Sequence, residues 1–191
     1  MEKHDALKID IKSLTLQELQ EAFRAEGLPA FRSKQVYQWL HRGAVSFDDM
    51  SNISKELRSS LNKKYYISVA SIEKKRVSMY DNTVKYLFRL HDGQYVESVL
   101  MEYHHGYSIC ISTQAGCKMG CTFCATGQGG WFRDLTPSEM LAQIQAAQQD
   151  SGHRVSNIVL MGMGEPLDNY ENVLRFLELV SSDEGMNIGA R

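Results

Sequence analysis

The sequence lacks the features of membrane and secreted proteins. No apolar run in its 191 residues is long enough to cross a bilayer, and the charged start, MEKHD, has no apolar segment behind it. Without a secretory signal, the four cysteines are not expected to form a disulfide framework. We therefore expect a cytoplasmic protein with reduced thiols and no membrane contact.

Strong net charge, internal repeats and low-complexity tracts are also missing. The formal net charge of -2 conceals an asymmetry, because residues 1–91 hold 16 Lys and Arg against 11 Asp and Glu, while residues 92–191 hold 5 against 12. A basic front half is compatible with binding a polyanion such as RNA. The alternative is that the basic residues form a solvated face of the helices, as they more often do.

Three of the four cysteines lie in one glycine-rich loop. Residues 116–127 read GCKMGCTFCATG and contain Cys117, Cys121 and Cys124 at spacings of four and three. Three thiolates can hold a four-iron cubane cluster and leave one iron open to a substrate or cofactor. A zinc site that adds Cys110 is less favoured, because structural zinc usually pairs two separated Cys-x2-Cys knuckles.

The first 66 residues are predicted to form a small, mildly basic helical module. A capping box at residues 15–18 begins a helix that Gly27 and Pro29 stop, and further helices are expected over residues 31–41 and 54–64. The apolar stripes of these helices are expected in the core: Leu16, Leu19, Phe23, Val36, Trp39, Leu40, Leu57 and Leu61. Basic residues beside the second stripe are the candidates for RNA contact: Arg32, Lys34 and Arg42.

Residues 67–191 are predicted to form a second domain of mixed α/β structure. Alternating patterns predict strands over residues 69–77, 84–90, 95–102 and 107–113, joined as successive antiparallel hairpins. A capped helix to about residue 150, a fully apolar strand over residues 155–161 and a helix over residues 170–181 follow. This order of helix, strand and helix indicates βα units with a parallel sheet.

Two loops are expected together beyond the carboxyl ends of these strands, where α/β proteins bind ligands. One is the cysteine loop, and the other is residues 162–167, which read GMGEPL. Glycines there would let the backbone approach a ligand, and the Glu165 carboxylate or nearby carbonyls could hold an ammonium group. A glycine-rich turn after a buried strand is usually only a turn. The position of this one, one βα unit after the cysteine loop, favours a role in ligand binding.

The cysteine loop resembles the signature of radical S-adenosylmethionine enzymes, in which the open iron binds the amino and carboxylate groups of that cofactor. Four further segments make the resemblance specific: FRSKQVYQW at 31–39, VESV at 96–99, CISTQAGC at 110–117 and GMGEPL at 162–167. Together they resemble the RlmN/Cfr family of radical adenosine methyltransferases over nearly the whole chain. The RlmN branch, which methylates C2 of an adenosine in 23S ribosomal RNA and in transfer RNA, is nearer than the C8-methylating Cfr branch, which stays an alternative.

The resemblance implies a 4Fe-4S cluster on Cys117, Cys121 and Cys124, with the methionine end of S-adenosylmethionine near Gly164 and Glu165. One cofactor molecule methylates a cysteine near the family's C-terminus, and a second is cleaved to a radical that activates this methyl group for addition to adenine. Glu97 then matches the family's proton acceptor, and Cys110 the cysteine that releases the covalent adduct by forming a disulfide. Partners implied are 23S rRNA, tRNA and an electron donor such as flavodoxin or ferredoxin, and we expect a monomer.

The residues themselves support the two catalytic assignments only in part. Alternation along the strand places Glu97 on one face with Tyr95, Val99 and Met101, an apolar neighbourhood that would raise the pKa of a carboxyl group. A solvated carboxylate at a strand edge is the simpler interpretation. Cys110, in the middle of an apolar strand, is by itself most simply an inert small hydrophobe.

The sequence departs from the family in its length. After Cys124 only 67 residues follow, enough for about two βα units of roughly 30 residues each. We therefore expect a helical module over residues 1–66 before an incomplete radical barrel over residues 67–191. The chain is expected to be an N-terminal fragment without the methyl-carrying cysteine, and the methyltransferase activity is expected of the parent enzyme. Two other classes stay open: another radical enzyme, such as an activase or maturase, and a non-catalytic RNA-binding or metal-binding fragment.

Overall fold

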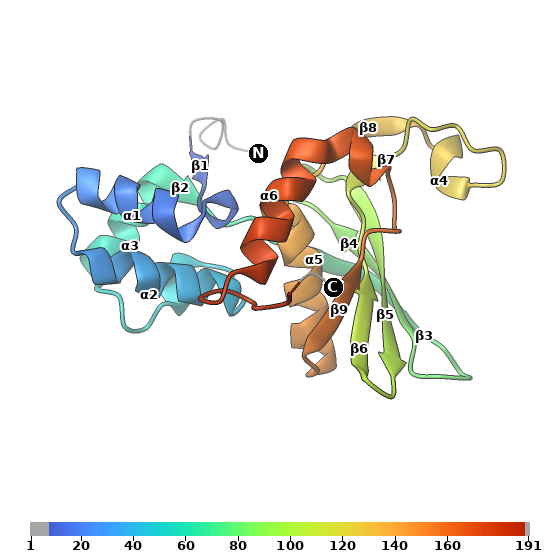
Figure 1. Ribbon diagram of the computed structural model, residues 1–191, viewed down its shortest axis with the longest axis horizontal. Helices are drawn as coiled ribbons and strands as arrows, with labels where there is room; N and C mark the ends of the chain where they lie inside the picture. The colour runs from blue at the N-terminus through green and yellow to red at the C-terminus, as the bar shows by residue number, and fades with distance from the viewer. Residues whose placement is uncertain (1–7, 190–191) are drawn as a thin grey trace. The chain divides into compact units, whose positions relative to one another are not determined.

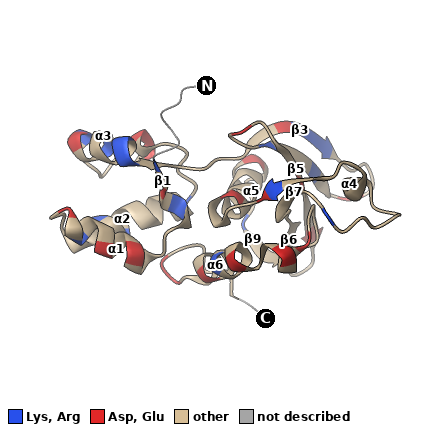
Figure 2. Ribbon diagram, turned by 90° about the horizontal axis from the view of Figure 1, so that it is seen from above, with Lys and Arg blue, Asp and Glu red and all other residues tan. Residues whose placement is uncertain are grey.

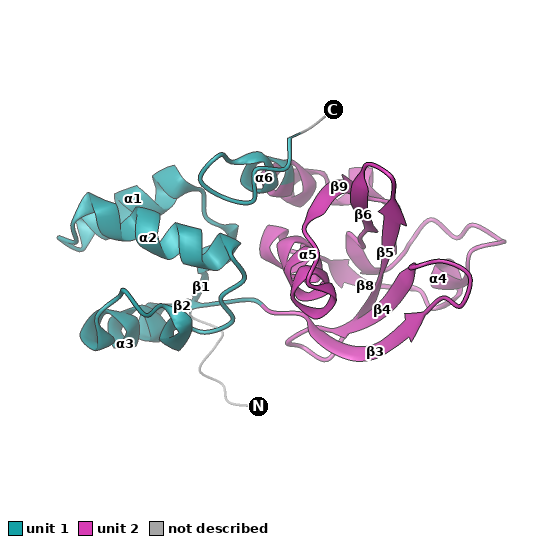
Figure 3. Cartoon of the chain, turned by 90° about the horizontal axis from the view of Figure 1, so that it is seen from below, with its two compact units in different colours: residues 1–68, 177–191 teal, residues 69–176 magenta. Residues whose placement is uncertain are grey.

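The computed structural model describes residues 8–189, which divide into two compact units (Figure 3). Unit 1 contains the chain up to Ser68 together with the segment from Leu177, and unit 2 runs from Val69 to Phe176. The boundary after Ser68 lies two residues beyond the boundary predicted after residue 66. The units differ from the predicted domains in that the segment from Leu177 belongs to unit 1. In the described part of the chain, no helix combines the length and hydropathy that a membrane span needs.

Unit 1 contains the three predicted helices, α1 (Leu16–Ala25), α2 (Ala30–His41) and α3 (Lys55–Lys64). The capping box that begins α1 is present, with Thr15 and Glu18 each accepting a hydrogen bond from the other's backbone N–H. The remaining elements are two short parallel strands and two 3-10 helices: β1 (Ile9–Asp10), β2 (Tyr65–Tyr66), η2 (Ile11–Ser13) and η3 (Phe47–Asp49).

The core of unit 1 follows the predicted stripes except at Leu16 and Leu57, which are only half-buried, and at Trp39. Leu19, Phe23, Val36, Leu40 and Leu61 are buried, as expected from helical spacing. The prediction that Trp39 belongs to this core is wrong: its ring is half-exposed, its indole N–H donates to Asn52 at 2.7 Å, and Tyr37 is the buried aromatic of α2 instead. An indole needs a partner for its N–H, which the surface supplies more readily.

Unit 2 is built on a five-stranded sheet of order β3-β4-β5-β6-β9 (Figure 1). Its strands are β3 (Ser71–Val77), β4 (Val84–Arg89), β5 (Tyr95–Tyr103), β6 (Gly106–Cys110) and β9 (Val155–Val159). The first four pair as antiparallel hairpins, and β9 adds to β6 in parallel. The predicted hairpins and the predicted parallel βα unit are therefore both present.

Helix α5 (Pro137–Ser151) covers one face of this sheet (Figure 3). Both polar and apolar side chains of the helix are buried. The buried amide of Gln143 accepts from the Ser98 hydroxyl at 2.8 Å and from the Ser112 N–H at 2.9 Å, and donates to the Ser112 carbonyl at 3.0 Å. Because every one of these groups is buried and paired, the helix is held in one position on the sheet.

The remaining elements carry the two candidate loops. A two-stranded sheet of β7 (Gln114–Gly116) and β8 (Trp131–Asp134) flanks the cysteine loop with its short helix α4 (Ala125–Gln128), and η4 (Pro166–Asn169) leads into α6 (Tyr170–Ser181). The prediction of a fully apolar strand at 155–161 is wrong: β9 stops at Val159, contains Ser156 and Asn157, and buries only Val155 fully. It pairs with β6 alone, so most of its side chains are not covered on both faces.

Candidate functional site

The cysteine loop leaves the β7–β8 sheet through a narrow neck. The Cys117 N–H donates to the Gly130 carbonyl at 2.9 Å, which closes the loop at its base. Gly116 has φ +79°, and a Cβ at this position would lie 2.0 Å from the Gly130 oxygen. Only glycine fits here, so this glycine of the motif shapes the loop itself.

The three loop cysteines are free thiols near the surface, with Cys121 exposed and Cys117 and Cys124 half-buried. The backbone N–H groups of Gly127 and Thr126 lower the pKa of the Cys124 thiol, which favours the thiolate that binds metals. Within residues 8–189, no three His, Cys, Asp or Glu side chains are gathered closely enough to hold a metal ion. The loop therefore contains three thiol donors that are not gathered around a single point.

The donor set nevertheless fits an iron–sulfur cluster better than a zinc ion. The loop offers three soft thiol donors and no carboxylate or imidazole between Cys117 and Cys124. The fourth cysteine, Cys110, ends strand β6 outside the loop, and burial raises the pKa of its thiol despite a hydrogen bond from the Met161 backbone. Three thiolates with a fourth position open is the arrangement expected of a cluster that binds a cofactor.

The second loop, residues 162–167, is fixed by hydrogen bonds to the chain that extends from β6. The Met163 carbonyl accepts from the N–H groups of Thr113 and Gln114 at 2.9 and 3.2 Å, and the Met163 N–H donates to the Ser112 hydroxyl at 2.9 Å. The Glu165 N–H donates to the Gln114 side chain at 3.0 Å. The loop is thus an ordered extension of the sheet edge.

The glycines of this loop allow a close approach to protein atoms, whereas the sequence led us to expect a close approach to a ligand. A Cβ on Gly164 would lie 2.5 Å from the Gln114 Cβ, and one on Gly162 would lie 2.7 Å from the Ile111 carbonyl. The Glu165 carboxylate caps the following turn by accepting from the Leu167 N–H at 3.1 Å. Gly164 and Glu165 both lie against Gln114, the first residue of β7, and their role toward a ligand stays a prediction.

An ion pair joins the two loops. Lys118, between the first two cysteines, lies 2.8 Å from Asp168, which directly follows the second loop, and its ammonium also lies over the Trp131 ring. Gln114 donates to the same Asp168 carboxylate at 3.3 Å, and the two partners lower the pKa of Asp168. The buried Asn169 amide then ties this segment to the Thr113 and Leu135 carbonyls. Neither Lys118 nor Asp168 was found from the sequence, since ordinary surface charges carry no motif.

Glu97 and Cys110 share the sheet face opposite α5. Cys110 pairs with Val99 across the β5–β6 ladder, and Val99 lies two residues from Glu97 on the same side of β5. The expectation of an apolar neighbourhood for Glu97 is wrong. Its half-exposed carboxylate forms a 2.8 Å ion pair with Lys85 and lines a hollow of about 190 Å³ with Leu87, Lys74 and Arg76. The buried face of β5 is the other one, with Val96, Ser98 and Leu100.

The basic residues predicted for RNA contact in unit 1 are partly engaged. Lys34 pairs with Glu184 at 2.7 Å, and Arg32 donates to Gln35 and to the Asn52 carbonyl while lying over the Phe31 ring. Arg42 is exposed at the end of α2.

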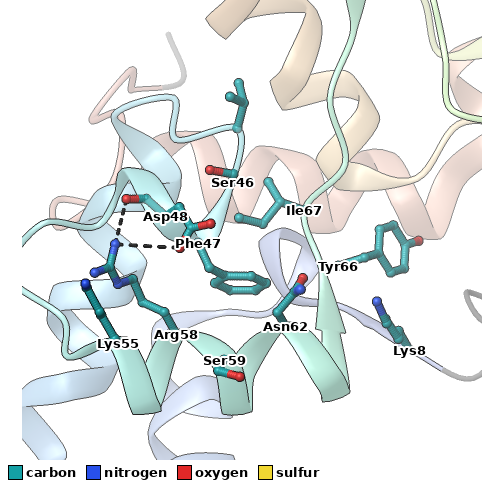
Figure 4. Close-up of a pocket in the computed structure, with 11 residues that line it drawn as sticks. Lys8, Ser46, Phe47, Asp48, Lys55, Arg58, Ser59, Asn62, Tyr66 and Ile67 are labelled. Carbon is teal, nitrogen blue, oxygen red and sulfur yellow. Dashed lines mark hydrogen bonds and ion pairs between the residues drawn. The ribbon is translucent and has the colours of Figure 1, made fainter.

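A separate pocket of about 510 Å³ in unit 1 offers another polar surface (Figure 4). Lys8, Lys55 and Arg58 line it together with Phe47 and Tyr66. Arg58 donates to the Asp48 carbonyl at 2.8 Å, so its guanidinium is held at the wall of the pocket. Cationic and aromatic side chains together are typical of surfaces that contact single-stranded nucleic acid.

Comparison with known protein families covers both units. Residues 9–67 match the family model described as the ribosomal RNA large subunit methyltransferase N-terminal domain, and residues 111–190 match the radical SAM superfamily. Residues 68–110, which include Glu97 and Cys110, lie between the two matches.

Curated relatives and a solved structure agree with these matches. A protein of Alkaliphilus oremlandii is 50% identical over 184 residues and one of Lachnoclostridium phytofermentans is 52% identical over 185, each aligned over 96% of this chain, and both are named probable dual-specificity RNA methyltransferase RlmN. The chain covers 54% and 52% of them, so it spans about half the length of the curated relatives it matches. The crystal structure of a radical SAM methyltransferase from Sphaerobacter thermophilus matches with a TM-score of 0.88 and 41% identity, over 96% of this chain and 55% of that one.

Proposed function

We propose, from the premise that the chain belongs to the RlmN/Cfr family of radical S-adenosylmethionine enzymes, that it provides part of an RNA adenine methyltransferase. The activity we infer is methylation of C2 of an adenosine in 23S rRNA and in tRNA. Relatives named as dual-specificity RNA methyltransferases support C2 over the C8 alternative. Because the chain spans about half of those relatives, the activity is proposed for the enzyme to which these residues contribute.

The observation that carries this proposal is the ion pair between Lys118 and Asp168, which brings the cysteine loop and the second loop together. Cys117, Cys121 and Cys124 would hold the 4Fe-4S cluster, and Gly164 and Glu165 the methionine end of S-adenosylmethionine. When bound, this pair supplies the one-electron chemistry that activates a methyl group. The chain's contribution is to present three thiolates and a rigid, hydrogen-bonded loop at the same end of the sheet.

Glu97 and Cys110 have the proton and thiol roles in this proposal. Glu97 accepts the C2 proton of the adenine after the methylene carbon has attached. The Cys110 thiol then attacks the sulfur of the methyl-carrying cysteine, so that an S–S bond forms as the S–CH2 bond breaks, and the thiol proton passes to the released carbon to complete the methyl group. The four cysteines of this sequence are all assigned to the cluster or to this release step, so the methyl-carrying cysteine is a further one. The position of Glu97 and Cys110 on one face, on neighbouring strands, supports a shared substrate.

We propose that the helical module contacts RNA. We also propose that the enzyme is a cytoplasmic monomer and that an electron donor such as flavodoxin or ferredoxin reduces its cluster. The pocket beside Lys55 and Arg58 supports the RNA contact. Lys55→Glu is expected to weaken tRNA binding by about tenfold, measured by fluorescence anisotropy, because it replaces a phosphate-attracting charge with a repelling one. Lys63→Glu, on the same helix but outside the pocket, is the matched control.

The activity is tested in a fusion that adds the remaining length of a relative to these residues. The chain is joined after Arg191 to the remaining residues of the Alkaliphilus oremlandii relative, reconstituted anaerobically with iron and sulfide, and incubated with S-adenosylmethionine, a reductant and either tRNA or a 23S rRNA fragment. We expect C2-methyladenosine by mass spectrometry of the digested RNA. Glu97→Gln and Cys110→Ala should instead accumulate a covalent protein–RNA adduct, and Cys124→Ala should give neither product nor adduct.

Each other outcome selects an alternative. C8-methyladenosine would assign the chain to the Cfr-type reaction, and ordinary turnover by the Cys110→Ala fusion would remove Cys110 from the mechanism. A fusion that binds four irons and RNA but modifies no adenosine would support a non-catalytic RNA-binding or metal-binding role.

A further inference from the structure

Strand β3 presents its basic residues on two different faces. Its central run, Lys74, Lys75 and Arg76, is visible as blue ribbon in Figure 2. Lys75 pairs with Asp150 of α5 at 2.5 Å on the covered face of the sheet. Lys74 and Arg76 point to the opposite face, and residues 8–189 provide neither with an ion-pair partner.

Register places these two residues in rows with the proposed catalytic groups. Arg76 pairs with Lys85, Lys85 with Val99, and Val99 with Cys110, so one row across four strands begins with two cations and ends with the thiol. The neighbouring row contains Lys74, Leu87 and Glu97. Residues directly opposite on antiparallel strands lie roughly 5 Å apart at Cβ, so the cations and the catalytic groups occupy one continuous surface.

The charge on this surface is not balanced. Lys74, Arg76 and Lys85 line the hollow, and Glu97, paired with Lys85, is the one carboxylate among the described residues that line it. A hollow of about 190 Å³ is smaller than the roughly 300 Å³ at which small-molecule pockets begin. It suits a phosphate group and not a whole nucleotide, and a planar guanidinium beside two ammonium groups is a typical phosphate-binding set.

We propose that Lys74, Arg76 and Lys85 form a subsite for one backbone phosphate of the RNA substrate, next to the adenosine that reaches Glu97. This inference rests on the proposed function, since the RNA is the polyanion that function requires. The subsite lies in residues 68–110, outside both family-model matches. A phosphate held there fixes the register of the nucleotide chain relative to Glu97 and Cys110 without reading its sequence.

The test compares two neighbouring charge changes on one strand. The double variant Lys74→Ala with Arg76→Ala removes the unpaired cations and leaves Lys85 with Glu97, while Lys75→Ala removes a cation from the same strand on the covered face. Binding of fluorescein-labelled tRNA to the 191-residue chain is measured by anisotropy between 50 and 300 mM salt. Circular dichroism melting shows whether each variant is folded.

The double variant is expected to bind at least about fivefold more weakly, and its slope of log K against log salt should be shallower by about 0.7 to 0.9. Lys75→Ala should keep the wild-type slope. Equal losses of affinity in both variants would overturn the inference, because the effect would then be one of net charge. An unchanged salt slope in the double variant would also overturn it, as would the absence of tRNA binding by the wild-type chain.

The fusion described above separates this inference from the proposed function. If the double variant of the fusion methylates tRNA with an unchanged KM, the phosphate subsite is wrong and the methyltransferase assignment stands. A raised KM with kcat little changed supports the subsite. If the unaltered fusion makes no methyladenosine although it binds four irons, the proposed function fails whatever the binding slopes show.

Discussion

The two loops at the end of the unit 2 sheet differ in what determines their shape. In residues 162–167, backbone groups and glycines make close contacts with other protein atoms. The Met163 carbonyl accepts two backbone hydrogen bonds, and Gly164 lies close to the Gln114 side chain. Beyond its neck, the cysteine loop has few such contacts: Gly120 has no atom within 4 Å of a Cβ position, and Phe123 and Cys121 are exposed.

This difference shows that the second loop is shaped by its contacts with the protein, whereas the cysteine loop beyond its neck is not. A thiolate loop around a cluster obtains its order from bonds to the metal, because metal binding is coupled to folding of the site. The following experiments would break or sharpen this comparison, beginning with the largest expected effect.

The first compares cysteines of the loop with the cysteine of the sheet. Anaerobic reconstitution of the 191-residue chain with iron and sulfide should give about four irons per chain. Alanine at Cys117, Cys121 or Cys124 should remove essentially all of this iron, whereas Cys110→Ala should keep it. Stoichiometric zinc without sulfide, or loss of iron in Cys110→Ala, would refute the cluster assignment.

The second compares thiol reactivity in the metal-free chain. Cys124 should react with iodoacetamide at least about tenfold faster than Cys110 at pH 7.5, because its pKa is lowered by backbone N–H groups while burial raises the pKa of Cys110. As pH rises, the Cys124 rate should level off below the pH expected of a free thiol and the Cys110 rate above it. Peptide mass spectrometry follows both sites, and equal rates would contradict the described environments.

The third compares two glycines with positive φ. Gly164→Ala should lower the free energy of unfolding by roughly 3 kcal/mol, since the new Cβ overlaps Gln114 and the backbone conformation disfavours any side chain. Gly120→Ala meets only the conformational penalty and should cost about 1 kcal/mol. Urea unfolding measures both, and equal losses would mean that the second loop is not shaped by its contact with Gln114.

The fourth and smallest effect concerns the ion pair between the loops. Asp168→Asn should leave the unfolding midpoint nearly unchanged, because the pair is exposed, but should speed amide hydrogen exchange in residues 117–130. Because Lys118 lowers the pKa of Asp168, the pair forms throughout neutral pH and is lost only as pH falls through that lowered value. The control is Glu171→Gln, because Glu171 is a nearby carboxylate without an ion pair among residues 8–189. Similar amide exchange in both variants would show that Lys118 does not anchor the loop.

Local patterns were sufficient for much of this protein. The capping boxes, the helical stripes and the change to alternation after residue 68 predict the helices and hairpins, because helices and hairpins depend on neighbours in the sequence. The cysteine spacing predicts the donor set in the same way. Family matches and relatives confirm the resemblance on which the cofactors rest.

Tertiary structure alone decided which face of each strand is covered. Alternation predicts that Glu97 and Ser98 point to opposite faces, but only the packing of α5 through Gln143 shows that the Ser98 face is buried. The pairing of β3, β4 and β5 surrounds Glu97 with Lys74, Arg76 and Lys85, and a separate contact between loops places Lys118 against Asp168. Such contacts join residues 12 to 50 positions apart, so no local period in the sequence records them. The energy of burial decides which face of the sheet is covered, and strand pairing then sets the neighbours of the residues on the other face.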